Sequence, residues 1–249
     1  MVYFIGAGPG DPELITVKAF NLLKTAKCVI YAGSLINREI LNTAPNNCIV
    51  HNSAEMTLEQ IIDVMLENEK SKIDTLRLHT GDPSIFSAVR EQADALNRHK
   101  INYQIIPGVS SFSAASAALK KEMTLPGVSQ TIIITREEGK TPVPKSQSLE
   151  ILAKIKASLA IFLSVDKIND IVKKLIPYYG EKAFVSVVYK ASWKDEKIIK
   201  GTLADISEKV ITAEIKKTAI IFVGDFLGND YQLSKLYDKN FSHEFRKKI

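Results

Sequence analysis

Five short β-rich runs in the first half of the chain each end at a turn residue, and an amphipathic stretch follows each of them. The runs cover residues 2–5, 28–31, 48–51, 75–79 and 103–106. The amphipathic stretches cover residues 12–26, 34–43, 57–69, 84–98 and 110–119. Strands that alternate with helices at this spacing predict βαβ units and a mainly parallel sheet.

The pattern changes near residue 120, where Lys120-Lys121-Glu122 interrupts the apolar periodicity. Further strands are expected over 131–135, 159–163, 184–189, 197–203 and 219–223, and helices near 148–157, 166–178 and 205–215. The polar bend at residues 193–196 separates two β-rich runs and predicts an antiparallel hairpin. We therefore expect an α/β protein with two lobes and a ligand cleft between them: residues 1–119 with a mainly parallel sheet, and residues 120–249 with a mixed one.

Composition narrows the functional classes. The chain has 249 residues, of which 45% are hydrophobic and 24% charged, and no apolar run reaches the roughly 18 residues of a membrane helix. The N-terminus does not read as a signal peptide, and Cys28 and Cys48 are expected to be reduced core residues, so the cytoplasm is the predicted compartment. The net charge of +5 comes without a basic stripe, which disfavours nucleic-acid binding. The four His and two Cys are too scattered to predict a metal site.

The glycine loop that follows the first run imitates a dinucleotide-binding site. Such a site has the spacing G-x-G-x-x-G and an acidic residue at the end of the next strand. Gly6 and Gly8 fit this pattern, but Asp11 takes the third glycine position and Gly10 falls one place early. The next run ends at residues 30–34 without a carboxylate. The loop therefore predicts a strand-to-helix turn with Asp11 as the helix cap.

Two later loops have the same character. Gly81-Asp82-Pro83 follows the fourth run, and Pro107-Gly108-Val109-Ser110-Ser111 follows the fifth. Asp82 is expected to cap a helix that starts at Pro83. Loops after parallel strands lie along one edge of a sheet, and this arrangement suits an adenosine or carboxylate ligand, although it is also compatible with well-formed turns alone.

Taken in order, these loops and the run Thr218–Gly224 resemble the tetrapyrrole methylases, the class III S-adenosylmethionine-dependent methyltransferases. The segments Tyr31-Ala32-Gly33-Ser34-Leu35, 135–144 and 189–193 resemble the branch that methylates C-11 of precorrin-4 or cobalt-precorrin-4 in cobalamin synthesis. Glu137 and Lys140 depart from that branch, whose members more often have Thr and Arg there. Lys140 keeps the charge but loses the bidentate grip of an arginine.

The resemblance implies S-adenosylmethionine as the cofactor, S-adenosylhomocysteine as the product, a tetrapyrrole substrate and a homodimer. It implies cofactor contacts from Pro9, Gly81, Asp82, Ile85, Phe86, Ser110, Ser111, Leu163, Tyr189, Lys190, Ala191, Thr218, Ala219 and Ile220. Gly8, Arg38, His79, Arg136, Glu138 and Lys140 are candidates for binding the substrate and its carboxylate arms. Asp82 and Glu138 are candidates for a base, with no catalytic residue assigned. Two alternatives stay open: another tetrapyrrole substrate such as uroporphyrinogen, and a nucleotide-binding module without chemistry.

Overall fold

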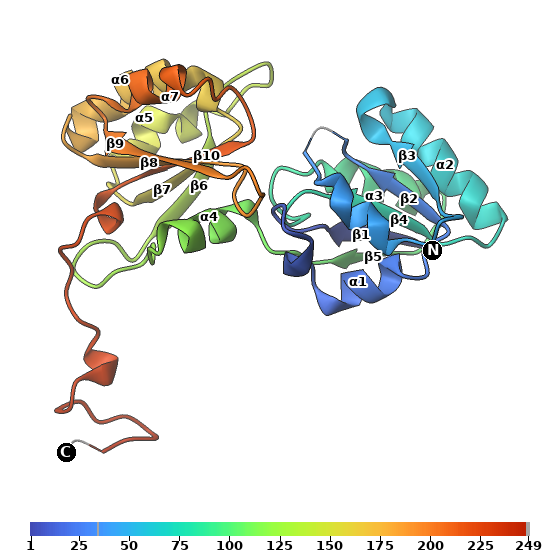
Figure 1. Ribbon diagram of the computed structural model, residues 1–249, viewed down its shortest axis with the longest axis horizontal. Coiled ribbons are helices and arrows are strands. Elements are labelled where there is room, and N and C mark those ends of the chain that lie inside the picture. The colour runs from blue at the N-terminus through green and yellow to red at the C-terminus, as the bar shows by residue number, and fades with distance from the viewer. Residues whose placement is uncertain (34, 248–249) are drawn as a thin grey trace. The chain divides into compact units, whose positions relative to one another are not determined.

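The computed structural model describes residues 1–33 and 35–247, and Ser34 of the 31–35 segment lies outside the described residues. The chain divides into two compact α/β units, which confirms the predicted fold class (Figure 1). The first unit comprises residues 1–118 and 190–196, and the second comprises residues 119–189 and 197–249. We propose a domain boundary between residues 119 and 120, and the segment 190–196 belongs to the first unit.

The first unit is built on a five-stranded parallel sheet. Its strand order is β3 (Ile49–Asn52), β2 (Cys28–Tyr31), β4 (Thr75–His79), β1 (Val2–Gly6) and β5 (Tyr103–Ile106). The helices are α1 (Val17–Leu23), α2 (Leu58–Lys70), α3 (Val89–Arg98) and α4 (Ser111–Leu119). Gly6 pairs with His79 and Tyr31 with Leu78, so the carboxyl ends of the strands share one edge of the sheet.

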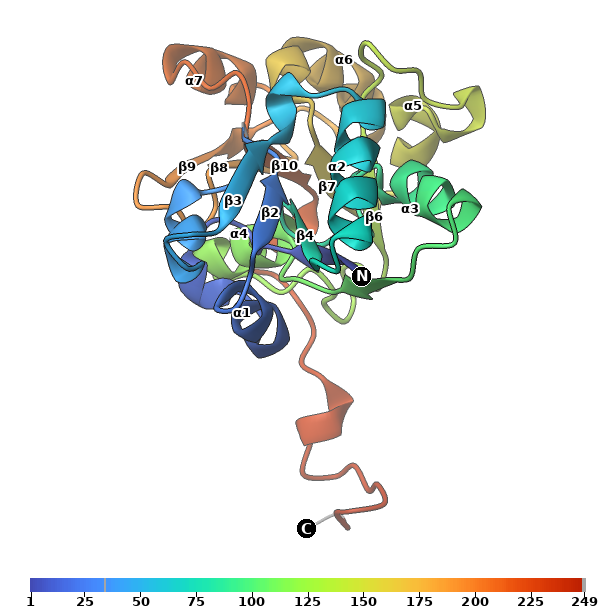
Figure 2. The ribbon, with the colours of Figure 1, turned by 90° about the vertical axis from the view of Figure 1, so that its right-hand side faces the viewer.

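Alternation along β1 divides the core of this unit into two layers. Ile5 packs with the α1 residues Ala19 and Leu23 in one cluster, whereas Phe4 packs with residues of α2 and α3 in another. Successive strand residues point to opposite faces, so both faces of the sheet are covered by helices. Figure 2 shows α2 and α3 on the same side of these strands.

The second unit has a mixed sheet of the order β6 (Ile132–Arg136), β7 (Ser158–Phe162), β10 (Ala219–Val223), β8 (Phe184–Tyr189) and β9 (Lys197–Thr202). Only β6 and β7 pair in parallel, and β8 and β9 form the predicted hairpin. The helices α5 (Leu149–Ala153), α6 (Ile168–Tyr179) and α7 (Ile206–Thr212) lie together along the sheet (Figure 1). One apolar cluster that includes Leu159, Ile171 and Val187 forms the core.

Three predicted helices of the first unit are shorter than expected. The stretch 12–26 is a 3-10 turn, Pro12–Leu14, followed by α1, and the stretch 34–43 is a 3-10 helix over Arg38–Thr43. The helix predicted over 84–98 begins only at Val89, because Phe86 and Ala88 have φ values of 51° and an α-helix cannot pass through them. Among the described residues, no helix is long and apolar enough to cross a membrane.

Candidate active site

Three strand-end loops of the first unit interlock through backbone contacts at glycines. A Cβ at Gly6 would lie 2.6 Å from the Gly108 Cα and 2.7 Å from the Gly81 carbonyl oxygen. Gly81 donates its N–H to the Gly8 carbonyl at 2.8 Å, and Gly8 donates to the Gly81 carbonyl at 3.3 Å. Only glycine at position 6 allows this approach, so the loops after β1, β4 and β5 form one continuous surface.

Asp82 fastens two of these loops together. One carboxylate oxygen accepts the Gly108 N–H at 2.8 Å, and the other accepts the Ser84 N–H at 2.8 Å and the Ser84 hydroxyl. Partial burial acts to raise the pKa of Asp82, but these hydrogen bonds outweigh it and the pKa lies below its ordinary value. The prediction that Asp82 caps a helix starting at Pro83 is wrong, because the first helical residue is Val89.

An exposed aromatic ring follows Asp82 in the chain, and a buried hydroxyl precedes it. The Phe86 side chain is 47% exposed, and its backbone is in the left-handed region with a φ of 51°. The Thr80 hydroxyl oxygen is buried and has no hydrogen-bond partner among the described residues. A nucleoside offers both a flat apolar face and polar hydroxyls, so these groups fit the adenosyl part of the implied cofactor.

His79 lies in the core rather than on the surface. Its side chain is 4% exposed, and its ring centroid is 5.9 Å from that of Phe4. Burial and, secondarily, the charge of Arg77 lower the pKa of His79 to about 3, so the ring is neutral at physiological pH. The predicted contact between His79 and the substrate therefore gains no support from its position.

The first glycine loop is held by side chains for which the sequence predicted no such contact. Trp193 donates its Nε1–H to the Pro9 carbonyl at 2.9 Å, and the Asn37 amide donates to the Gly10 carbonyl at 2.9 Å. The Asp11 N–H donates to the Ser192 Oγ at 3.0 Å. The sequence feature that could have predicted such a contact is Gly10, the glycine that falls one place too early for the dinucleotide-binding pattern.

In the second unit, the register brings the remaining cofactor candidates to one edge of the sheet. Ala219 at the start of β10 pairs with Tyr189 at the end of β8, and β7 runs antiparallel to β10, so Leu163 follows the strand end nearest Ala219. The Leu163 side chain is 60% exposed. Residues 163, 189 and 218–220, which are far apart in sequence, thus meet at this edge, whereas Lys190 and Ala191 belong to the first unit.

Backbone conformation singles out the same positions. Among the described residues, eleven other than glycine have positive φ, and five of them lie one to three residues after a helix end, where this conformation is common: Lys72, Lys100, Lys120, Lys156 and Glu214. Four others, Phe86, Leu163, Lys190 and Thr218, are predicted cofactor contacts. Strained backbone persists where the surrounding structure fixes it, and it gathers at ligand sites.

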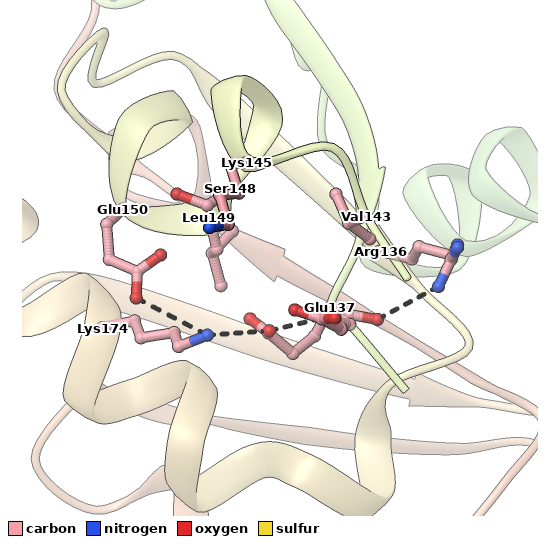
Figure 3. Close-up of a pocket in the computed structure, with 9 residues that line it drawn as sticks. Arg136, Glu137, Val143, Lys145, Ser148, Leu149, Glu150 and Lys174 are labelled. Carbon is pink, nitrogen blue, oxygen red and sulfur yellow. Dashed lines mark hydrogen bonds and ion pairs between the residues drawn. The ribbon is translucent and has the colours of Figure 1, made fainter. Parts of the chain in front are cut away.

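A pocket of about 310 Å³ in the second unit lies over the 136–144 segment (Figure 3). Glu137 lines it, is 8% exposed, and accepts hydrogen bonds from the Lys174 Nζ at 2.8 Å and from the Glu138 N–H at 3.0 Å. Lys174 also lies 3.5 Å from the Glu150 carboxylate. Glu137, one of the two departures from the related branch, is thus neutralised by a lysine of α6.

The candidate substrate-binding side chains differ in their contacts and exposure. Arg136 donates to the carbonyls of Thr141 at 3.1 Å and Pro142 at 2.8 Å, so it braces its own loop. The Arg38 guanidinium lies over the Tyr31 ring at 6.0 Å. Lys140 and Glu138 are exposed. Gly8 is buried inside the interlocked loops, whereas Arg38 is exposed like Lys140 and Glu138, so these three are the candidates most open to a ligand.

Within residues 1–33 and 35–247, no group of three or more His, Cys, Asp and Glu side chains is arranged to hold a metal ion.

Comparison with known proteins identifies the class to which the fold and these loops belong. The family model of the tetrapyrrole (corrin/porphyrin) methylases matches residues 1–207, and the chain belongs to this family. It is 54% identical over 248 residues to a cobalt-precorrin-4 C(11)-methyltransferase of Methanocaldococcus jannaschii, covering 99% of this chain and 96% of that protein.

Solved structures show the same fold. A crystal structure of the cobalamin biosynthetic enzyme cobalt precorrin-4 methyltransferase has a TM-score of 0.89 and 41% identity, over 92% of this chain and 96% of that one. A uroporphyrin-III C-methyltransferase of Thermus thermophilus, solved with S-adenosylhomocysteine, has a TM-score of 0.75 and 25% identity, over 91% of this chain and 92% of that one.

Proposed function

We propose that this chain is an S-adenosylmethionine-dependent methyltransferase that methylates C-11 of precorrin-4 or cobalt-precorrin-4 in cobalamin biosynthesis. The observation that carries the proposal is the 54% identity, over 99% of the chain, to a protein with this named activity. The fold match at a TM-score of 0.89 to a cobalt precorrin-4 methyltransferase also supports the proposal.

We propose that the cofactor contacts are the fourteen residues implied by the family resemblance. In the first unit, Phe86 and the Thr80–Asp82 turn offer an exposed ring and polar groups. In the second, Leu163 and Thr218, whose backbones are in the left-handed region, lie at the same sheet edge as Tyr189. S-adenosylmethionine, when bound, supplies a methyl group on a positively charged sulfur, so the chain's contribution is to hold and orient the reactants.

Binding of the tetrapyrrole's carboxylate arms is assigned to the cations near the strand ends. Lys140 is exposed, whereas the Arg136 guanidinium is bound to its own loop, so Lys140 is the stronger candidate. Of the two candidate bases, Asp82 has a lowered pKa and three hydrogen bonds, which makes it a weak proton acceptor. Glu138 is exposed and is the base candidate we retain.

We also propose a homodimer in the cytoplasm, with no nucleic-acid or membrane partner, on the basis of family resemblance and composition. A monomeric sedimentation profile at micromolar concentration would contradict the dimer.

The test is an assay of the purified chain with precorrin-4 and, separately, cobalt-precorrin-4, in which NMR locates the new methyl group. Methylation at C-11 is expected, and the preferred substrate tells whether cobalt is already present. Calorimetric titration with S-adenosylmethionine and with NAD is the control. Methylation at another carbon, or tight NAD binding without S-adenosylmethionine binding, would overturn the proposal.

A further inference from the structure

Three consecutive residues of the first glycine loop, which share two peptide units, are held by side chains from two distant segments. The Pro9 carbonyl accepts from Trp193 at 2.9 Å, the Gly10 carbonyl accepts from Asn37 at 2.9 Å, and the Asp11 N–H donates to Ser192 at 3.0 Å. Side chain-to-backbone bonds at each of three successive residues leave this stretch little freedom to shift.

The indole ring of Trp193 also occupies the space beside Gly10. A Cβ at position 10 would overlap the ring atoms Cδ1 and Nε1, so the ring lies against the Gly10 backbone. Both Pro9 and Gly10 are buried, and Trp193 is half-buried. The ring therefore combines packing with a directed hydrogen bond, as buried tryptophans commonly do.

The segment that carries Trp193 is braced by hydrogen bonds and an ion pair of its own. The Trp193 N–H donates to the Lys190 carbonyl at 2.9 Å, and the Ser192 N–H donates to the Glu196 carboxylate at 2.7 Å. The Lys194 Nζ reaches Glu39 at 2.7 Å, two residues beyond Asn37. A rigid support transmits its own position to the loop that it holds.

We infer that Trp193 is a positioning residue of the methyl-transfer site, acting through the first glycine loop. Gly8 and Gly81 exchange two backbone hydrogen bonds, so a shift at Pro9 and Gly10 would pass to the turn that carries Asp82. Displacing a reacting group by about 1 Å can lower the rate about 100-fold. This inference rests on the proposed function for its kinetic consequence, but its structural part does not.

The test compares Trp193→Phe, which keeps an aromatic ring but lacks the indole N–H, and Trp193→Ala, which removes both. Tyr237→Phe, an exposed aromatic position, is the control. In the two variants, hydrogen exchange at the Gly8, Gly10 and Asp11 amides should accelerate by about 10-fold or more, while exchange in β7 and β10 stays as in the wild type. The kcat should fall about 10-fold in Trp193→Phe and about 100-fold in Trp193→Ala, with the KM for S-adenosylmethionine changed less than about twofold.

Trp193 is the only tryptophan of the chain, so its fluorescence reports directly on this contact. Its emission should change on tetrapyrrole binding in the wild type. Unchanged exchange at the three amides in both variants would overturn the inference, as would a loss of kcat accompanied by faster exchange throughout β7 and β10. A wild-type chain that transfers no methyl group would instead refute the proposed function, and the exchange comparison would still decide the positioning role.

Discussion

Replacing His79 should change how the stability of this protein depends on pH. The ring is 4% exposed, and its pKa is lowered to about 3 by burial and by the neighbouring Arg77 charge, from 6.5 in the unfolded chain. As the pH falls below about 6.5, the unfolded state takes up a proton that the folded state does not. Stability is therefore lost progressively from about pH 6.5 down to about pH 3.

The magnitude follows from this window. Each pH unit within it corresponds to about 1.4 kcal/mol for one group, so the loss at pH 5 is about 2 kcal/mol. His79→Gln carries no such proton. Lost packing lowers its stability equally at every pH, so the difference in unfolding free energy between pH 7.5 and pH 5 should still shrink by about 2 kcal/mol relative to the wild type.

Urea unfolding at the two pH values, extrapolated to water, measures this difference. His99→Gln, at an exposed position after α3, is the matched control and should retain the His79 contribution. A His79→Gln protein that loses as much stability as the wild type between pH 7.5 and pH 5 would refute the reasoning, as would an NMR titration in which His79 protonates near 6.5.

Three further predictions concern the loops. Gly6→Ala places a Cβ 2.6 Å from the Gly108 Cα and should destabilise the fold by about 1–3 kcal/mol, whereas Gly139→Ala, with no heavy atom nearer than 3.5 Å, should leave the melting temperature nearly unchanged. Lys174→Met leaves Glu137 buried without its cation and should lower the free energy of unfolding by about 2 kcal/mol. The double variant Glu137→Thr/Lys174→Met should restore most of this stability. Equal melting temperatures of the single and double variants would count against the explanation. Asp82→Asn should lower stability at neutral pH by about 1–3 kcal/mol, because the lowered pKa makes the Asp82 contribution one of the ionised form. The difference from the wild type should begin to shrink below about pH 4 and should disappear only when the pH falls below the lowered pKa; thermal melts at pH 7 and pH 3 compare the two.

The sequence was sufficient to predict the strands of both sheets, because the residue patterns that indicate a strand are local. β2, β4, β8 and β10 match the predicted runs, and each is a short β-rich segment bounded by turn residues. The register that gathers the candidate residues at one edge of each sheet follows from strand direction alone. The prediction of a parallel first sheet and a mixed second sheet needed nothing more.

The sequence could not give the conformations that depend on distant contacts. The segment 84–88 has a helical pattern, but Asp82 bonds to Gly108 instead of capping it, and Phe86 and Ala88 take left-handed conformations. Arg136 was predicted to bind substrate because it ends a strand, and only the structure reveals that its own loop takes up its donors. The support of the first glycine loop by Trp193 joins residues 184 positions apart.

This last contact has a consequence for how the sequence can change over time. A side chain at position 10 overlaps the indole ring, and loss of the indole leaves the Pro9 carbonyl without its donor. Each residue thus makes the other difficult to replace alone, and the fitness effect of a change at one site depends on the residue at the other. In homologues, Gly10 and Trp193 should be gained and lost as a pair, although nothing in their separation along the chain marks them as partners.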